Sequence, residues 1–142
     1  MEKDLYHQVG ACVELLSVSD YHNRVPLDYC MARLILPAIH NKQFKLYYSS
    51  KQKVQALVTW AWLTKKELKS ACAPEGRGPI PLDKWNCGTF LYIADFIAPY
   101  GNVRKVILDM KNNNFPNIDK AFSVRRGMDR SVRKKSTWRN RE

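Results

Sequence analysis

Two residues of this sequence combine a reactive side chain with surroundings that suit proton transfer. His22 lies in the polar run Ser-Asp-Tyr-His-Asn-Arg, and an imidazole is the side chain whose charge changes close to neutral pH. Asp95 interrupts the apolar run 88–97, where a carboxylate without a partner is strongly unfavourable. An aspartate in such a place is well suited to orient a histidine and to stabilise its imidazolium form. We therefore predict that His22 and Asp95 form a catalytic pair.

Each of these residues also has a plainer interpretation. His22 fits a surface loop without a chemical role, and Asp95 fits a helix cap or an acceptor for the turn at 98–101. Ser19, three residues before His22, would either hydrogen-bond the imidazole or cap the turn. A Ser-His-Asp hydrolase is conceivable, but the sequence has no G-x-S-x-G elbow.

Other kinds of chemistry have less support in the sequence. His7 and His40 fall in predicted helices and are interpreted as structural or surface residues. Gly76 and Gly78 are followed by prolines, which cannot open the helix of a phosphate-binding motif. The four cysteines lack C-x-x-C spacing, so neither a zinc site nor a redox motif is indicated. We expect no metal and no bound cofactor.

The predicted helices place His22 between them. Apolar residues at helical spacing over 5–16 indicate a first helix, and the polar stretch 17–24 then puts His22 on a loop. Pro26 suits the first turn of a second helix, which Pro37 is expected to disturb. The histidine loop is therefore held at both ends.

The rest of the pattern predicts strands and two further helices. Residues 44–48 and 54–63 read as a hairpin, and Thr64 with Glu67 has the capping-box pattern. The remaining elements are an irregular loop at 73–81, a central strand at 88–97, a helix at 103–110 capped by Asn102, and a strand at 121–124. This order predicts an α/β (α+β) fold with a central mixed sheet flanked by helices. The predicted domain covers 1–124, and 125–142 form a basic C-terminal tail for which disorder is one interpretation.

The charge indicates an anionic partner. Lys and Arg number 24 against 13 Asp and Glu, a net charge of +11, and more than half of this excess lies in 125–142. Nucleic acid, a membrane surface or an acidic protein would fit. The N-terminus does not resemble a secretory signal, and no apolar run reaches the roughly 18 residues of a membrane span. We expect a cytoplasmic protein without a transmembrane segment.

Four strings of residues occur in a characteristic order along the chain. They are Ser19-x-x-His22 followed by Pro26, the string LPAI at 36–39, the string VTWA at 58–61, and the string DFIAPYG at 95–101. Together they resemble the landmarks of the toxin-activating lysine acyltransferases that accompany RTX haemolysins and leukotoxins. The resemblance covers roughly 8–125, and the DFIAPYG string is its most specific part. The stretch 73–81 and the basic tail depart from it.

The resemblance implies a GNAT-like acyltransferase fold, usually a homodimer, that acts in the cytosol on an RTX protoxin. Such enzymes take a fatty acyl group from acyl carrier protein and attach it to internal lysines of the toxin. On the matching positions, His22 is the catalytic histidine, Asp95 is the catalytic aspartate, and Ser19 is a serine of the same site.

The acidic character of acyl carrier protein would explain the basic charge of this chain. Lys51, Lys53, Arg104 and Lys105 are candidate docking residues for this donor. One alternative is a non-catalytic basic nucleic-acid-binding protein, although no nucleic-acid-binding motif is present and the resemblance implies no such partner. The other is an acyl-CoA-dependent acyltransferase that uses the same pair on another acceptor.

Overall fold

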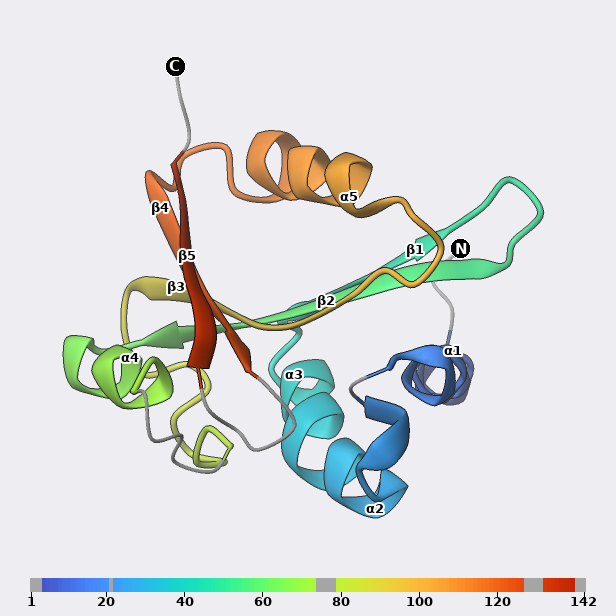
Figure 1. Cartoon of the computed structure of the whole chain (residues 1–142), viewed down its shortest axis with the longest axis horizontal. Helices are drawn as coiled ribbons and strands as arrows, with labels where there is room; N and C mark the ends of the chain where they lie inside the picture. The colour runs from blue at the N-terminus through green and yellow to red at the C-terminus, as the bar shows by residue number, and fades with distance from the viewer. Residues whose placement is uncertain (1–3, 21, 74–78, 127–131, 140–142) are drawn as a thin grey trace.

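The elements of the fold follow the predicted order, with one additional strand. A computed structural model of the chain describes residues 4–20, 22–73, 79–126 and 132–139 (Figure 1). The helical elements are α1 (Leu5–Val18), a 3₁₀ turn (His22–Arg24), α2 (Leu27–Tyr29), a π-helical segment (Cys30–Ile35), α3 (Leu36–His40), α4 (Lys65–Ala71), α5 (Val103–Asp109) and a second π-helical segment (Met110–Asn114). The strands are β1 (Phe44–Tyr48), β2 (Val54–Leu63), β3 (Phe90–Ile97), β4 (Lys120–Arg126) and β5 (Val132–Arg139).

The five strands form one mixed sheet in the order β1-β2-β3-β4-β5. Strands β1, β2 and β3 are antiparallel neighbours, β4 is parallel to β3, and β5 is antiparallel to β4. Parallel neighbours cannot be joined by a tight turn, and α5 lies in the connection from β3 to β4. The predicted central mixed sheet flanked by helices is confirmed.

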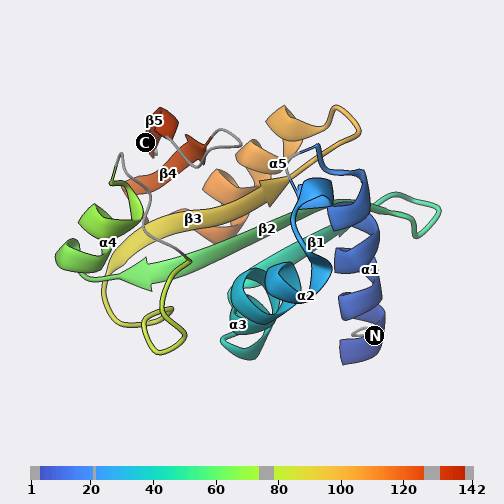
Figure 2. The same cartoon turned by 60° about the horizontal axis from the view of Figure 1, so that its bottom comes forward.

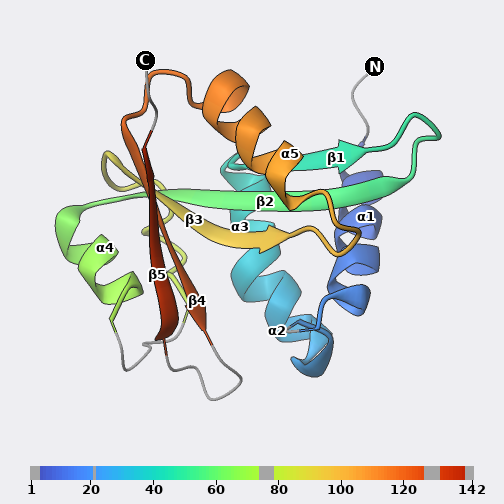
Figure 3. The same ribbon diagram turned by 45° about the horizontal axis from the view of Figure 1, so that its top comes forward.

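Helices cover the two faces of the sheet unequally. Helix α5 lies on one face, and α1, α2, α3 and α4 lie on the other (Figures 1 and 3). Figure 2 shows α1 beside α2 and α3, next to the half of the sheet in which β3 ends. Among the helices of the described ranges, none combines the length and the apolar composition needed to cross a bilayer.

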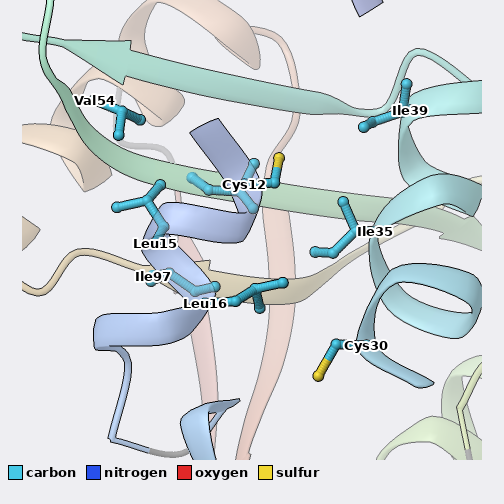
Figure 4. Packing of buried hydrophobic residues seen from close by; sticks show 9 residues of the cluster. Cys12, Leu15, Leu16, Cys30, Ile35, Ile39, Val54 and Ile97 are labelled. Carbon is cyan, nitrogen blue, oxygen red and sulfur yellow. The ribbon is translucent and has the colours of Figure 1, made fainter. Parts of the chain in front are cut away.

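The apolar core beneath α1 fixes this helix against the sheet. Asp4 caps the helix by accepting a hydrogen bond from the backbone N–H of His7 at 2.8 Å. Leu15 and Leu16 are buried in one cluster with Ile35 and Ile97 (Figure 4). Complete burial of each such side chain contributes about 1.5–3 kcal/mol. The end of α1 is thus held close to the end of β3.

The second helical region continues further than predicted. Its helical backbone runs from Leu27 to His40 and passes through a π-helical segment at Cys30–Ile35, so the expected disturbance at Pro37 does not end it. A proline lacks the N–H of a helical bond, and its ring clashes with a carbonyl one turn earlier in a regular α-helix. The wider π-helical turn directly before α3 accommodates this clash.

Three local predictions need correction. Asn102 precedes α5, but its side chain makes no capping hydrogen bond, with φ at −102° and ψ at 23°. The strand predicted at 121–124 is β4, which is longer than predicted and runs from Lys120 to Arg126. A further strand, β5, pairs with β4 from Lys120↔Arg139 to Arg126↔Val132. Residues 132–139 therefore belong to the sheet and not to a disordered tail. The dense positive charge of this segment concealed a strand from composition alone.

A polar cluster connects the edge strand β1 to α5. Asp109 Oδ2 accepts hydrogen bonds from Lys45 Nζ at 2.6 Å and from the Tyr47 hydroxyl at 2.5 Å. Its other oxygen accepts from Asn113 Nδ2 at 2.8 Å, and Lys45 also donates to Asn114 Oδ1. Burial raises the pKa of Asp109, but the hydrogen bonds from Lys45, Tyr47 and Asn113 outweigh it and lower the pKa to about 2. The charged form of Asp109 therefore stabilises the fold.

We predict that Asp109→Asn lowers the free energy of unfolding at pH 7. The folded pKa lies below the ordinary value, so this stabilisation is complete above about pH 4 and is lost as the pH falls through about 2. The shift corresponds to at most about 2.5 kcal/mol. Since the Asp109 side chain is 27% exposed, we expect on the order of 1–2 kcal/mol.

Urea unfolding of both proteins at pH 7 and pH 3 checks this prediction. The difference between wild type and variant should shrink by about half at pH 3. Asp119→Asn, which changes an exposed aspartate in the turn before β4, is the matched control. Equal stability of Asp109→Asn and wild type at pH 7 would contradict the prediction.

Candidate active site

The turn after α1 presents His22 to the sheet. Ser19 follows the last residue of α1, and its carbonyl accepts the backbone N–H of Asn23 at 2.9 Å. This bond spans four positions, and residues three positions apart within such a turn lie close together. Ser19 Oγ lies 2.7 Å from His22 Nδ1 and 3.4 Å from the backbone nitrogen of His22. The S-x-x-H spacing thus places the hydroxyl against the ring.

His22 also reaches across to β3. Its Nε2 lies 2.7 Å from Asp95 Oδ1, although the two residues are 73 positions apart in the chain. The side chains of His22 and Asp95 are only 7% and 10% exposed, so their contact is largely shielded from solvent. Asp95 is therefore not the helix cap that the alternative interpretation suggested.

The hydrogen bonds define the proton positions of the neutral ring. A carboxylate only accepts hydrogen bonds, so Asp95 requires a proton on Nε2 of His22. Nδ1 then has a free lone pair and accepts the Ser19 O–H. If the ring gains a second proton, Nδ1–H donates to Ser19 Oγ, and Asp95 stabilises the resulting positive charge. The arrangement can accept a proton at Nδ1 and release it again.

A buried thiol lies close to this pair. Cys30, 1% exposed, belongs to the π-helical segment after α2. Burial raises the pKa of Cys30, and the nearby charges of Asp95 and Asp28 raise it further. Its thiolate form is disfavoured, and the thiolate is the form of cysteine that acts as a nucleophile. Cys30 is therefore a packing residue of the site.

The structure brings together three of the seven predicted site residues: Ser19, His22 and Asp95. The four predicted docking residues are exposed and lie elsewhere, with Lys51 and Lys53 on the β1–β2 turn and Arg104 and Lys105 in the first turn of α5. Their roles stay predictions. Within the described ranges, no group of three or more His, Cys, Asp and Glu side chains could hold a metal ion.

Thr59 is a further residue of the site that was not predicted from the sequence. Its hydroxyl accepts the backbone N–H of Asp95 at 3.0 Å, and Thr59 is fully buried. A threonine in an apolar strand signals β propensity and no particular role. The string VTWA contained the residue, but its contact with Asp95 depends on a strand register that the sequence does not display.

Comparison with known proteins identifies the family. The sequence model of the RTX toxin acyltransferase family matches residues 1–139, and the chain belongs to this family. The match extends beyond the resemblance at 8–125 and includes β5. The chain is accordingly an acyltransferase of the RTX toxin-activating class.

Three relatives illustrate the range of the similarity. The lysine-acyltransferase RtxC of Vibrio cholerae is 28% identical over 111 residues, 78% of this chain and 71% of the relative. The RTX-II toxin-activating lysine-acyltransferase ApxIIC of Actinobacillus pleuropneumoniae is 27% identical over 124 residues, 87% of this chain and 75% of the relative. An uncharacterised protein of Synechocystis sp. is 28% identical over 110 residues, 77% of this chain and 73% of the relative.

We predict that neutral His22 carries its proton on Nε2. Long-range proton–nitrogen correlation spectra of histidine-labelled protein distinguish the two neutral forms, and His22→Asn identifies the signals. Asp95→Ala should reduce the Nε2–H form, because its acceptor is removed. Ser19→Ala should retain it, since this serine lies at the other nitrogen. A wild-type ring with its proton on Nδ1 would contradict the assigned hydrogen bonds.

Proposed function

We propose that this protein transfers a fatty acyl group from acyl carrier protein to lysine side chains of an RTX protoxin, with His22 as the base and Asp95 as its partner. The observation that carries the proposal is the hydrogen-bonded chain Ser19–His22–Asp95 in a member of the RTX toxin acyltransferase family. The names of two relatives, both lysine-acyltransferases, support lysine as the acceptor.

The acceptor requires a base. A lysine amine has an ordinary pKa of about 10.4, so at neutral pH it must lose a proton before it can attack a thioester. Nδ1 of His22 takes this proton, directly or through the Ser19 hydroxyl, while Asp95 holds Nε2–H and stabilises the imidazolium.

The remaining steps form the amide bond and release the carrier as a free thiol. The neutral amine attacks the thioester carbonyl, and the carbon–sulfur bond breaks as the tetrahedral intermediate collapses. The imidazolium returns its proton to the departing thiolate, and the second proton of the amine is lost as the amide forms. The products are the acylated lysine, the free thiol of the carrier and one proton.

Direct transfer is favoured over an acyl-histidine intermediate. Both ring nitrogens of His22 have hydrogen-bond partners, so acylation of Nδ1 would first displace the Ser19 hydroxyl. In direct transfer His22 moves only a proton, and this proton can pass through the Ser19 hydroxyl along the existing hydrogen bond. Incubation of the enzyme with the acyl thioester of acyl carrier protein in the absence of protoxin separates the routes, because only the covalent route adds an acyl mass to the enzyme.

We predict that His22→Ala and Asp95→Ala each reduce acyl transfer at least about 10²-fold, since each removes general acid–base catalysis. The measurement is the mass of lysine-containing peptides from an RTX protoxin co-expressed with each enzyme. His40→Ala and Asp119→Ala replace an exposed histidine and an exposed aspartate and serve as matched controls. Undiminished acylation by His22→Ala, or none by folded wild type, would overturn the proposal.

The donor is proposed to approach the end of the sheet at which β3 ends. The β1–β2 turn and the start of α5 both lie toward this end, whereas α4 lies toward the opposite end (Figures 1 and 3). Lys51 and Lys53 are exposed on the turn, and Arg104 and Lys105 are exposed on α5. Four cations around one end of the sheet suit an acidic carrier protein.

We predict that simultaneous reversal of these four charges to Glu slows transfer from acyl carrier protein about 10-fold or more at low salt. Electrostatic steering is the reason, and the dependence of the rate on ionic strength should become weaker. Reversal of Lys65 and Lys66, two exposed cations of α4, is the control. An unchanged salt dependence in the fourfold variant would exclude docking at these residues.

Two further points of the proposal need separate experiments. Rates with acyl-CoA and with acyl carrier protein as donors distinguish the proposed enzyme from an acyl-CoA-dependent one with the same pair. A GNAT-like fold and a homodimer are proposed from the family resemblance. Sedimentation of the purified chain tests the dimer.

A further inference from the structure

The side chains of strand β3 do not alternate regularly between the two faces of the sheet along its whole length. Ile93 packs in the cluster beneath α5, and Ala94 packs on the opposite face of the sheet. Further on, Phe96 lies on the α5 face and Ile97 on the face of α1. Regular alternation would place residues 93 and 97 on the same face. One residue between them is therefore out of phase.

The pairing with β2 identifies this residue. Trp60 is opposite Ile93, and Thr59 is opposite Asp95, so one step along β2 corresponds to two steps along β3. Ala94 is the additional residue of a β-bulge, which commonly re-aims a side chain near an active site. If the register at Trp60 continued regularly, Asp95 would lie opposite Val58 and face α5 instead of His22.

Thr59 is placed to stabilise this bulge. Its neighbours along β2, Leu57 and Ala61, pack on the face away from α5, which puts the Thr59 side chain on the same face as Asp95. Thr59 is fully buried, and its hydroxyl accepts the backbone N–H of Asp95 at 3.0 Å. A bulge disrupts the ladder at this point, and a buried N–H without an acceptor is destabilising.

We infer that Thr59 is a positioning residue for the acid–base pair: its hydroxyl holds the backbone of Asp95 in the bulge that aims the carboxylate at His22. The inference rests on the proposed roles of His22 and Asp95. The hydrogen bond of Thr59 is made to the backbone of Asp95, so its effect on His22 is transmitted through Asp95. Cys30, whose pKa is raised by burial and by the charge of Asp95, keeps its own surroundings in the substitutions below.

Three substitutions of Thr59 separate positioning from packing. Thr59→Val keeps the shape and removes the acceptor, Thr59→Ala removes the acceptor without adding a methyl group, and Thr59→Ser keeps the hydroxyl. The proton position on His22 is measured in the protein without substrates, and kcat and KM are measured for transfer to a protoxin peptide. Thermal unfolding of each variant reports stability.

For Thr59→Val and Thr59→Ala we expect less of the Nε2–H form of His22 and a kcat about 10- to 100-fold lower, with KM changed less than threefold. Thr59→Ser should restore both to near the wild-type values. A purely structural role would lower the unfolding temperature but leave the ring proton and kcat of the folded protein unchanged, and this result would overturn the inference. If Thr59→Val does not fold, Thr59→Ala decides.

The ring measurement also separates this inference from the proposed function. It needs neither acyl donor nor protoxin. If wild type transfers no acyl group but Thr59→Val still shifts the ring proton, the proposed function fails and the positioning by Thr59 stands. If wild type transfers the acyl group and Thr59→Val matches it in rate and ring proton, the inference about Thr59 fails alone.

Discussion

A buried carboxylate within an apolar strand is the constraint around which the site is built. Asp95 loses most of its hydration on folding, so the fold must supply partners in place of water. The partner of the carboxylate is the imidazole of His22, which lies 73 positions earlier in the chain. The hydroxyl of Thr59 satisfies a different group of the same residue, its backbone N–H. The position of the N-terminal helices relative to the sheet follows from these contacts together with the apolar packing of α1.

The two faces of the sheet carry different kinds of residues. The face beneath α5 carries an apolar cluster. Hydrogen bonds from Lys45 and Tyr47 of β1 to Asp109 join α5 to the sheet beside this cluster. The other face carries the reactive groups, which lie between the end of α1 and the end of β3. Leu91 and Ile93 of β3 pack in the apolar cluster beneath α5, so this helix supports β3 from the face opposite the reactive groups.

Much of the fold could be predicted from the sequence, because hydrophobic spacing and local caps determine most of its elements. Apolar periodicity located α1, and the Thr64 cap located α4, whose side-chain bond to the N–H of Glu67 is present. The end of the second helix could not be predicted, since a proline usually stops an α-helix and a π-helical turn leaves no simple sequence pattern. Strand β5 was missed because its charge outweighed its β-branched and aromatic residues.

The candidate site was partly predictable for similar reasons. Asp95 stood out because a charge in an apolar strand needs an explanation, and Ser19 stood out by its spacing from His22. The hydrogen bond between His22 and Asp95 agrees with the expected pair, whereas its catalytic role stays a prediction. The bulge at Ala94 could not be foreseen, because it arises from the register of two strands and not from any residue type.

The junction between β3 and β4 ties the C-terminal part of the chain into the core. Within the described residues, these strands pair at Leu91↔Ala121 and Tyr92↔Phe122, whereas β4 and β5 pair along most of their lengths. Few backbone hydrogen bonds therefore join β4 to β3, and side chains supply much of the attachment. Ala121 is buried in the cluster beneath α5, and Phe122 packs against the cluster on the opposite face. Removal of β4 would accordingly open both apolar clusters and not merely shorten the edge of the sheet.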